Sequence, residues 1–328
     1  MNQGLLERCL HFAKTLWHWP LIHEVSVSLL NKGALFWHCC VLRLDLEEIR
    51  KKSRLLQEKG IQIPQRKTPR LIVSFTSFPD RIQEVFAVAY SLLTQSLKPD
   101  IVLLWLAEEE FPHKEQDLPE DLLRLCPLGL SICWCENLLS YKKLIPALKQ
   151  YPEDIIVTAD DDIFYPPDWL APLYTAYLND PTCIQAHAAF IACNHEGEIL
   201  PLSARKLLLW FERTTPSAYH HCPIGGPGIL YPPHSLHADV VHAEVFLEKC
   251  PANDDEWFWA MAIRQRTKIH CLNRSCGPLR FIDPKRQYGL CGRSTLFRFN
   301  QSAAGDLQRT SIPALYPDMK EILRASAN

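Results

Sequence analysis

The residues best suited to chemistry are three consecutive aspartates, Asp160, Asp161 and Asp162, which follow a short apolar run. Adjacent carboxylates repel one another and resist burial, so such a triplet contributes little to folding. A divalent cation removes that conflict, because Mg²⁺ and Mn²⁺ prefer hard oxygen ligands and can bridge two phosphates. The triplet therefore predicts a metal site, with a solvated acidic turn in which Asp162 caps the next segment as the alternative.

A second acidic cluster opens the apolar helical run that ends near Ile263, and it consists of Asp254, Asp255 and Glu256. Acids at a helix N-terminus satisfy unpaired amides and the helix dipole. That role accounts for one acid, and three in succession favour a functional role. The adjacent Trp257 and Trp259 would offer a face to a sugar, or pack in the core.

A turn at residues 74–81 follows the first apolar run and contains groups that suit a nucleotide. A hydroxyl, an aromatic stacking face and a cationic fork are supplied by Thr76, Phe78 and Arg81. The competing interpretation is a plain turn in which Ser77 or Asp80 caps the following helix.

Two lysines and a glycine-rich segment complete the candidate site. Lys142 and Lys143 precede the run that leads to the aspartates, where they would pair with a diphosphate or form a solvated helix face. Gly225 and Gly226 allow the backbone to approach a ligand closely, although a tight turn would also use them. The neighbouring histidines at 220 and 221 are not predicted as metal ligands, because a lone imidazole is usually structural.

These residues need a scaffold, and the apolar pattern predicts one. Strands are expected at 70–76, 100–106, 130–135 and 154–159, with helices at 81–96 and 141–150 between them. Near-continuous apolar strands alternating with helices predict an α/β fold with a single mostly parallel, Rossmann-like sheet and helices on both faces. Ligands gather beyond the carboxyl ends of such strands, where the aspartate triplet and the turn at 74–81 fall.

Composition bounds the remaining possibilities. The chain has 328 residues and a formal net charge of −2, which gives no basic field for nucleic acid. Residues 1–66 hold ten Lys/Arg against six Asp/Glu and are predicted to form a helical N-terminal region. This region would contact an anionic membrane peripherally, or pack on the catalytic domain or on the partner in a homodimer. Thirteen scattered cysteines without a C-x-x-C pair favour buried thiols in a reducing compartment. With neither a signal peptide nor an uninterrupted apolar span, we expect a cytoplasmic protein, free in the cytosol or peripheral on the inner face of the membrane.

The run Asp160-Asp-Asp-Ile-Phe-Tyr-Pro, preceded by Ser140-Tyr-Lys-Lys-Leu-Ile-Pro, resembles bacterial glycosyltransferases of the A-type fold. It is similar to the family-2-like enzymes that build lipopolysaccharide or capsule. The resemblance covers roughly 70–283 and implies a catalytic domain at 67–290, between the helical region at 1–66 and a C-terminal tail at 291–328. One departure is Leu106-Ala107-Glu108, where many family members carry an aspartate that holds the base.

The resemblance also implies roles for individual residues. Asp160 and Asp162 would bind Mn²⁺ or Mg²⁺, and Asp161 would face the ribose or sugar of a nucleotide-sugar donor, with a UDP-sugar expected first. Asp255, or alternatively Asp254, would deprotonate the hydroxyl of a glycan or lipid-linked acceptor. The glycine-rich segment would border donor sugar and acceptor. The rival functions are a nucleotidyltransferase that makes a nucleotide sugar and an inactive carbohydrate- or partner-binding protein.

Overall fold

The computed structural model describes residues 42–64, 67–208, 216–272, 279–287, 299 and 302–325. Most of the predicted N-terminal helical region, including all three of its tryptophans, lies outside the described residues. The chain divides into two compact units, one made of Met1–Leu44 and Asp283–Thr295 and the other of Asp45–Ile282 and Leu296–Asn328. In the smaller unit the described part contains α10 (Pro284–Gln287), whose first amides donate to the carboxylate of Asp283. The predicted domain boundaries at 66 and 290 stay a prediction.

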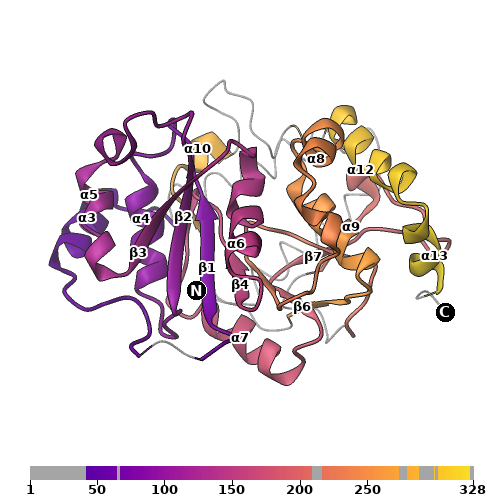
Figure 1. Ribbon diagram of the computed structural model, residues 1–328, viewed down its shortest axis with the longest axis horizontal. Helices are drawn as coiled ribbons and strands as arrows, with labels where there is room; N and C mark the ends of the chain where they lie inside the picture. The colour runs from indigo at the N-terminus through magenta and orange to yellow at the C-terminus, as the bar shows by residue number, and fades with distance from the viewer. Residues whose placement is uncertain are drawn as a thin grey trace. The chain divides into compact units, whose positions relative to one another are not determined.

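The larger unit is built on a seven-stranded sheet with the order β11-β6-β10-β4-β1-β2-β3 (Figure 1). Its strands are β1 (Leu71–Thr76), β2 (Ile101–Ala107), β3 (Leu130–Cys135), β4 (Ile155–Thr158), β6 (Ile184–Ala186), β10 (Ile229–Tyr231) and β11 (Ile269–Cys271). Strand β10 runs antiparallel to both neighbours, and all other pairs are parallel. The predicted α/β class and mostly parallel sheet are confirmed.

Strands β1 and β4 form the buried centre of this sheet. The first five residues of β1 and all four of β4 are buried, as expected for apolar strands covered by helices. The sheet is surrounded by the helices α3 (Leu46–Leu55), α4 (Val85–Leu93), α5 (Glu120–Leu123), α6 (Ile145–Gln150), α7 (Leu170–Asn179), α8 (Ala243–Lys249), α9 (Asp254–Arg264), α12 (Ala303–Leu315) and α13 (Asp318–Ala325). Short 3-10 turns lie at Lys114–Asp117, Cys126–Leu128, Leu202–Ala204 and Ala238–Val241.

Two predictions about the elements need correction. The sheet is not single: β12 (Arg280–Phe281) pairs with β5 (Ile163–Phe164), and β7 (Ala189–Ile191) lies between β8 (Lys206–Leu208) and β9 (His221–Pro223). The continuous helix predicted at 141–150 is a 3-10 turn, η3 (Leu139–Lys143), followed by α6. The proline at position 146 explains the break, because proline is tolerated in the first turn of a helix but not in its interior.

Helix α9 is almost wholly buried in the larger unit. Its two tryptophans are buried, and their indole nitrogens donate to the carbonyls of Val240 at 3.1 Å and Tyr219 at 2.8 Å. Trp257 and Trp259 are therefore core residues rather than a sugar platform. Helices α12 and α13, from the segment predicted as a C-terminal tail, pack against α9 (Figure 1).

The strand order creates a point where the chain reverses its direction across the sheet. From β1 the chain moves outward to β2 and β3, then returns to place β4 on the other side of β1. In open α/β sheets, the crevice outside the carboxyl ends of the two strands at such a point is the usual ligand site. The turn after β1 and the aspartates after β4 both lie at this switch point.

Candidate active site

Arg81, from the turn after β1, is the cation that faces the aspartate triplet. Its Nη1 lies 2.7 Å from Oδ1 of Asp161 and 2.9 Å from Oδ2 of Asp162. The hydroxyl of Ser77 donates to the other oxygen of Asp161 at 2.6 Å. The two motifs predicted from sequence are thus joined directly across the switch point.

Lys143, in η3, connects the triplet to the second acidic cluster. Its Nζ lies 2.9 Å from Oδ1 of Asp160, 3.0 Å from Oδ2 of Asp254 and 3.9 Å from Oδ1 of Asp255. The lysine side chain is only 6% exposed. Burial alone would lower the pKa of Lys143, but the three carboxylates outweigh it and hold that pKa well above its usual value. A permanently charged cation therefore sits between the two clusters.

The glycine-rich segment completes this arrangement. The amide of Gly225 donates to Oδ2 of Asp255 at 2.8 Å. A Cβ on Gly225 would lie 2.6 Å from Oδ1 of Asp255 and 2.9 Å from Nζ of Lys143, so a larger residue would displace both side chains. The backbone at Gly225 therefore packs closely against Asp255 and Lys143, and its predicted approach to a ligand stays a prediction.

Tyr165, at the end of the β5 segment, fixes the backbone on which the triplet stands. Its buried hydroxyl accepts from the amide of Asp160 at 2.8 Å and donates to the carbonyl of Gly226 at 2.9 Å. The triplet and the glycine-rich segment are therefore held to each other through one side chain. Sequence reasoning did not single out Tyr165 or Ser77 as site residues. The one feature of the sequence that indicated these two residues is their position next to the two motifs.

The carboxylates differ in how easily they hold a charge. Burial, reinforced by the neighbouring aspartates, raises the pKa of Asp162 to about 6 in spite of Arg81. Burial also raises the pKa of Asp255 to about 7, where Lys143 opposes the shift and Asp254 adds to it. A carboxylate whose pKa lies near neutrality is suited to accept a proton from a substrate.

Two predicted donor-binding residues, Thr76 and Lys142, contact other groups, whereas Phe78 stays exposed beside Arg81. The hydroxyl of Thr76 donates to the carbonyl of Trp105 at 2.8 Å, inside the sheet. Lys142 is buried and pairs with Glu110 at 2.8 Å, so it is not the lysine that meets the triplet. Phe78 is 40% exposed, close to the Arg81 guanidinium, which leaves its ring available for stacking.

The capping interpretation of the second cluster is not supported. The N-cap of α9 is Asn253, which makes no side-chain capping hydrogen bond. Asp254 and Asp255 lie in the first turn and are directed to Lys143 and Gly225 instead. Glu256 has a different partner, because it is buried against two arginines.

The donor set fits a divalent cation that also binds phosphate. Oδ2 of Asp160 and Oδ1 of Asp162 have no hydrogen bond or ion pair within the described part of the chain. Gly226 leaves space beside Asp160, since a Cβ there would lie 3.4 Å from that Oδ2. No group of three His, Cys, Asp or Glu residues converges among the described residues.

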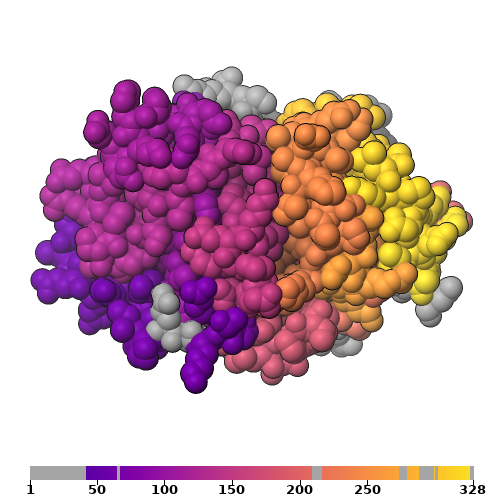
Figure 2. All heavy atoms as spheres, viewed as in Figure 1, coloured from indigo at the N-terminus to yellow at the C-terminus, as the bar shows by residue number. Residues whose placement is uncertain are grey.

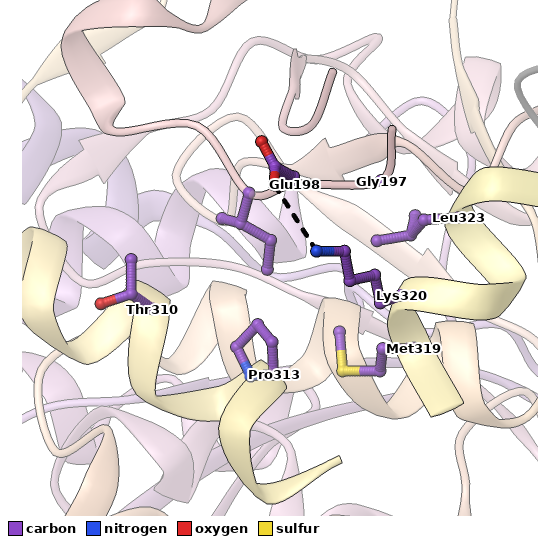
Figure 3. Close-up of a pocket in the computed structure, with 8 residues that line it drawn as sticks. Gly197, Glu198, Thr310, Pro313, Met319, Lys320 and Leu323 are labelled. Atoms are coloured by element: carbon purple, nitrogen blue, oxygen red, sulfur yellow. Dashed lines mark ion pairs between the residues drawn. The ribbon is translucent and has the colours of Figure 1, made fainter. Parts of the chain in front are cut away.

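A cavity elsewhere in the unit lies away from these residues. It has a volume of about 210 Å³ and is lined by Gly197, Glu198, Ile199, Thr310, Pro313, Met319, Lys320 and Leu323 (Figure 3). Its lining includes the 3.5 Å ion pair between Glu198 and Lys320, and none of the predicted site residues lines it.

The cysteines for which the structure gives a state are all free thiols. Across the described residues, every helix is too short or too polar to cross a bilayer.

The fold and the site define an α/β protein with two acidic clusters meeting at a switch point of its sheet. No protein-family model matches the chain, and no curated protein does so. Among solved structures it is similar to a mannosyltransferase of Pyrobaculum calidifontis, determined in complex with GDP-Man and Mn²⁺. That similarity has 14% identity and a TM-score of 0.40, over 92% of this chain and 86% of the other. A likeness at this level supports no conclusion about activity, so function is inferred below from the site alone.

The central position of Lys143 leads to a prediction about stability. Lys143→Met leaves the carboxylates of Asp160, Asp254 and Asp255 without their shared cation. Removing one partner of a buried ion pair costs about 3–5 kcal/mol, and solvent access to two of the acids favours the lower end. Because protonation relieves the repulsion, the loss in free energy of unfolding should be larger at pH 8 than at pH 5.

Urea unfolding of both proteins at the two pH values measures this effect. Lys142→Met is the matched control, since that lysine is equally buried but pairs with a single carboxylate, Glu110. Equal losses at pH 5 and pH 8 for Lys143→Met would contradict the assignment of this lysine as the shared counter-ion.

Proposed function

We propose that this chain is a metal-dependent glycosyltransferase that moves a sugar from a nucleotide-sugar donor to a hydroxyl of a glycan or lipid-linked acceptor. The observation that supports it best is the bridge made by Lys143 between Asp160 and the acidic pair Asp254–Asp255. The side chain of Lys143 thereby contacts both the proposed site for a metal-bound diphosphate and the acidic pair that contains the candidate base.

The donor side would consist of Asp160, Asp162 and Arg81, with Asp161 and the ring of Phe78 facing the nucleoside or sugar. A bound Mn²⁺ or Mg²⁺ would neutralise charge on the diphosphate. The diphosphate would sit at the carboxyl ends of β1 and β4, where Arg81 and Lys143 supply fixed positive charge.

The acceptor side would be served by Asp255. The acceptor oxygen attacks the anomeric carbon, its proton passes to the carboxylate of Asp255, and the bond from that carbon to the diphosphate breaks. The nucleoside diphosphate leaves with the bonding electrons, and a single displacement inverts the anomeric configuration. The pKa of about 7 for Asp255 keeps a large fraction of the base ionised at neutral pH. Gly225 and Lys143 hold the carboxylate in place.

A donor screen tests this proposal. We expect Mn²⁺-dependent release of nucleoside diphosphate from one member of a panel of UDP-, GDP- and CMP-sugars. Isothermal titration should show nucleotide binding that needs the metal. Formation of a nucleotide sugar from a nucleoside triphosphate and a sugar phosphate would instead indicate a nucleotidyltransferase. A chain that binds neither Mn²⁺ nor any nucleotide would be a binding protein of another kind, and the proposal would be wrong.

A further inference from the structure

A buried ionic cluster lies directly behind the acidic pair. Glu256 contacts Nη1 of Arg205, and its other oxygen lies 3.3 Å from Nη2 of the same residue. Nε of Arg309, in α12, lies 3.3 Å from Oε1 of Glu256. The side chains are 0%, 7% and 3% exposed for Arg205, Glu256 and Arg309, so the cluster is closed to solvent. Helix α12 is thus tied to the residue that follows Asp255.

Helix α12 also holds the residues that precede the acidic pair. Nη2 of Arg309 donates to Oδ1 of Asn253 at 3.3 Å. Oε1 of Gln308 accepts from Nδ2 of Asn253 at 2.9 Å and from the amide of Ala252 at 3.2 Å. Contacts from α12 therefore reach both sides of Asp254 and Asp255 in the sequence. In the space-filling view the yellow part of the chain, which includes α12, lies beside the orange part, which includes α8 and α9 (Figure 2).

These contacts replace the usual way of fixing a helix start. Asparagine at an N-cap normally accepts a hydrogen bond from an amide of the first turn. Here the Asn253 side chain makes no such bond and is held by Arg309 and Gln308 instead. The side chain at the start of α9, directly before both candidate catalytic acids, is therefore held by α12 and not by the first turn itself.

The two arginines are balanced by two carboxylates, the buried Glu256 and the 33% exposed Asp306. Arg309 pairs with Asp306 at 2.8 Å as well as with Glu256, so two arginines meet two carboxylates. Buried ion pairs of this kind are weak sources of stability because desolvation offsets the attraction. Their directional hydrogen bonds nevertheless restrict the geometry of the groups they join.

We propose that Arg309 and Gln308 are positioning residues that set the first turn of α9, and with it Asp254 and Asp255, against Lys143 and Gly225. That this placement matters for sugar transfer rests on the function proposed above. Arg309 acts through a fork that reaches three residues, Glu256, Asn253 and Asp306. The single ammonium of a lysine cannot reproduce that fork.

The test compares Arg309→Lys with Arg324→Lys. Arg324 is a matched control, because it is an arginine of the neighbouring helix α13 whose contact is the carbonyl of Glu196, away from α9. Amide hydrogen exchange at Gly225 reports the position of Asp255 without any substrate, since that amide donates to its carboxylate. We expect Gly225 to exchange about tenfold faster or more in Arg309→Lys and unchanged in Arg324→Lys.

Kinetics supply a second measurement. Transfer in Arg309→Lys should fall by about 10²-fold in turnover, as for a reacting group misplaced by about 1 Å, with donor affinity unchanged. If wild-type protein transfers no sugar, the proposed function fails, and exchange at Gly225 still decides the positioning role. Unchanged protection of Gly225 in Arg309→Lys would overturn the inference.

A folding defect would be recognised by exchange at the β1–β2 amides, which neither variant contacts. Should Arg309→Lys lose that protection, Gln308→Leu replaces it, because it removes the bonds to Ala252 and Asn253 without leaving a buried charge. The same comparison at Gly225 then applies. Protection of Gly225 equal to wild type in Gln308→Leu would also overturn the inference.

Discussion

Replacing Asp160 or Asp162 with alanine is expected to abolish sugar transfer while the protein stays folded. Each change removes a hard oxygen ligand from the proposed metal and diphosphate site. Removing a residue that hydrogen-bonds to a metal ligand typically lowers activity by roughly 10–100-fold. Removing a ligand itself should lower activity by more than that. The fold should survive because each cation keeps another partner: Arg81 retains Asp161, and Lys143 retains Asp254.

Titration of each variant with Mn²⁺ and a nucleoside diphosphate, together with turnover, measures the effect. Asp162→Ala should also remove a carboxylate whose ionisation burial opposes, so its stability should equal or exceed that of wild type. Glu120→Gln, which changes an exposed acid on α5, controls for loss of charge alone. Wild-type turnover by Asp162→Ala in the presence of Mn²⁺ would disprove the metal assignment.

Asp255→Asn is expected to reduce transfer by roughly 10²–10⁴-fold, the contribution typical of a general base, with donor binding little changed. The amide keeps the shape of the side chain and can still accept from Gly225, but it cannot take a proton. Asp254→Asn is the comparison variant and should be milder, because Asp254 contacts Lys143 and is only 10% exposed.

The pH dependence provides an independent check on the same residue. A base must be ionised, so transfer by wild type should fall as the pH drops below about 7, the pKa of Asp255. Asp255→Asn should lack that acidic limb. The pKa of Asp255 is higher in the folded protein than in the unfolded chain. The contribution of this carboxyl to the free energy of unfolding is therefore favourable below the ordinary pKa of an aspartate, and it is lost as the pH rises through about 7. The variant should therefore be as stable as wild type at pH 8.

Two results would contradict this assignment. Near-normal turnover in both Asp255→Asn and Asp254→Asn would mean that the second cluster is structural, and would reopen a retaining mechanism. A larger loss in Asp254→Asn would exchange the roles of the two acids. Urea unfolding of both variants at pH 8 excludes a folding defect as the cause of either result.

The sequence by itself determined the scaffold around the site. Apolar runs near 71, 101, 130 and 155 became β1, β2, β3 and β4 within a residue of their predicted starts. Local patterns suffice for β1, β2 and β4, because a strand buried on both faces needs a nearly uninterrupted apolar run. Strand β3 lies at the edge of the sheet and is mostly half-buried. Both acidic clusters could be recognised from the sequence in the same way, because burying several consecutive carboxylates costs free energy at any place in a fold.

Tertiary structure decided which side chains meet. The adjacent Lys142 and Lys143 are equivalent in sequence, yet the turn of η3 directs one to Glu110 and the other to both acidic clusters. Likewise, Asn253 occupies the N-cap position of α9, but its side chain is hydrogen-bonded to Arg309 of α12 and does not cap the helix. Such partners lie far apart along the chain, so their contacts depend on strand order and side-chain direction, which no local pattern encodes.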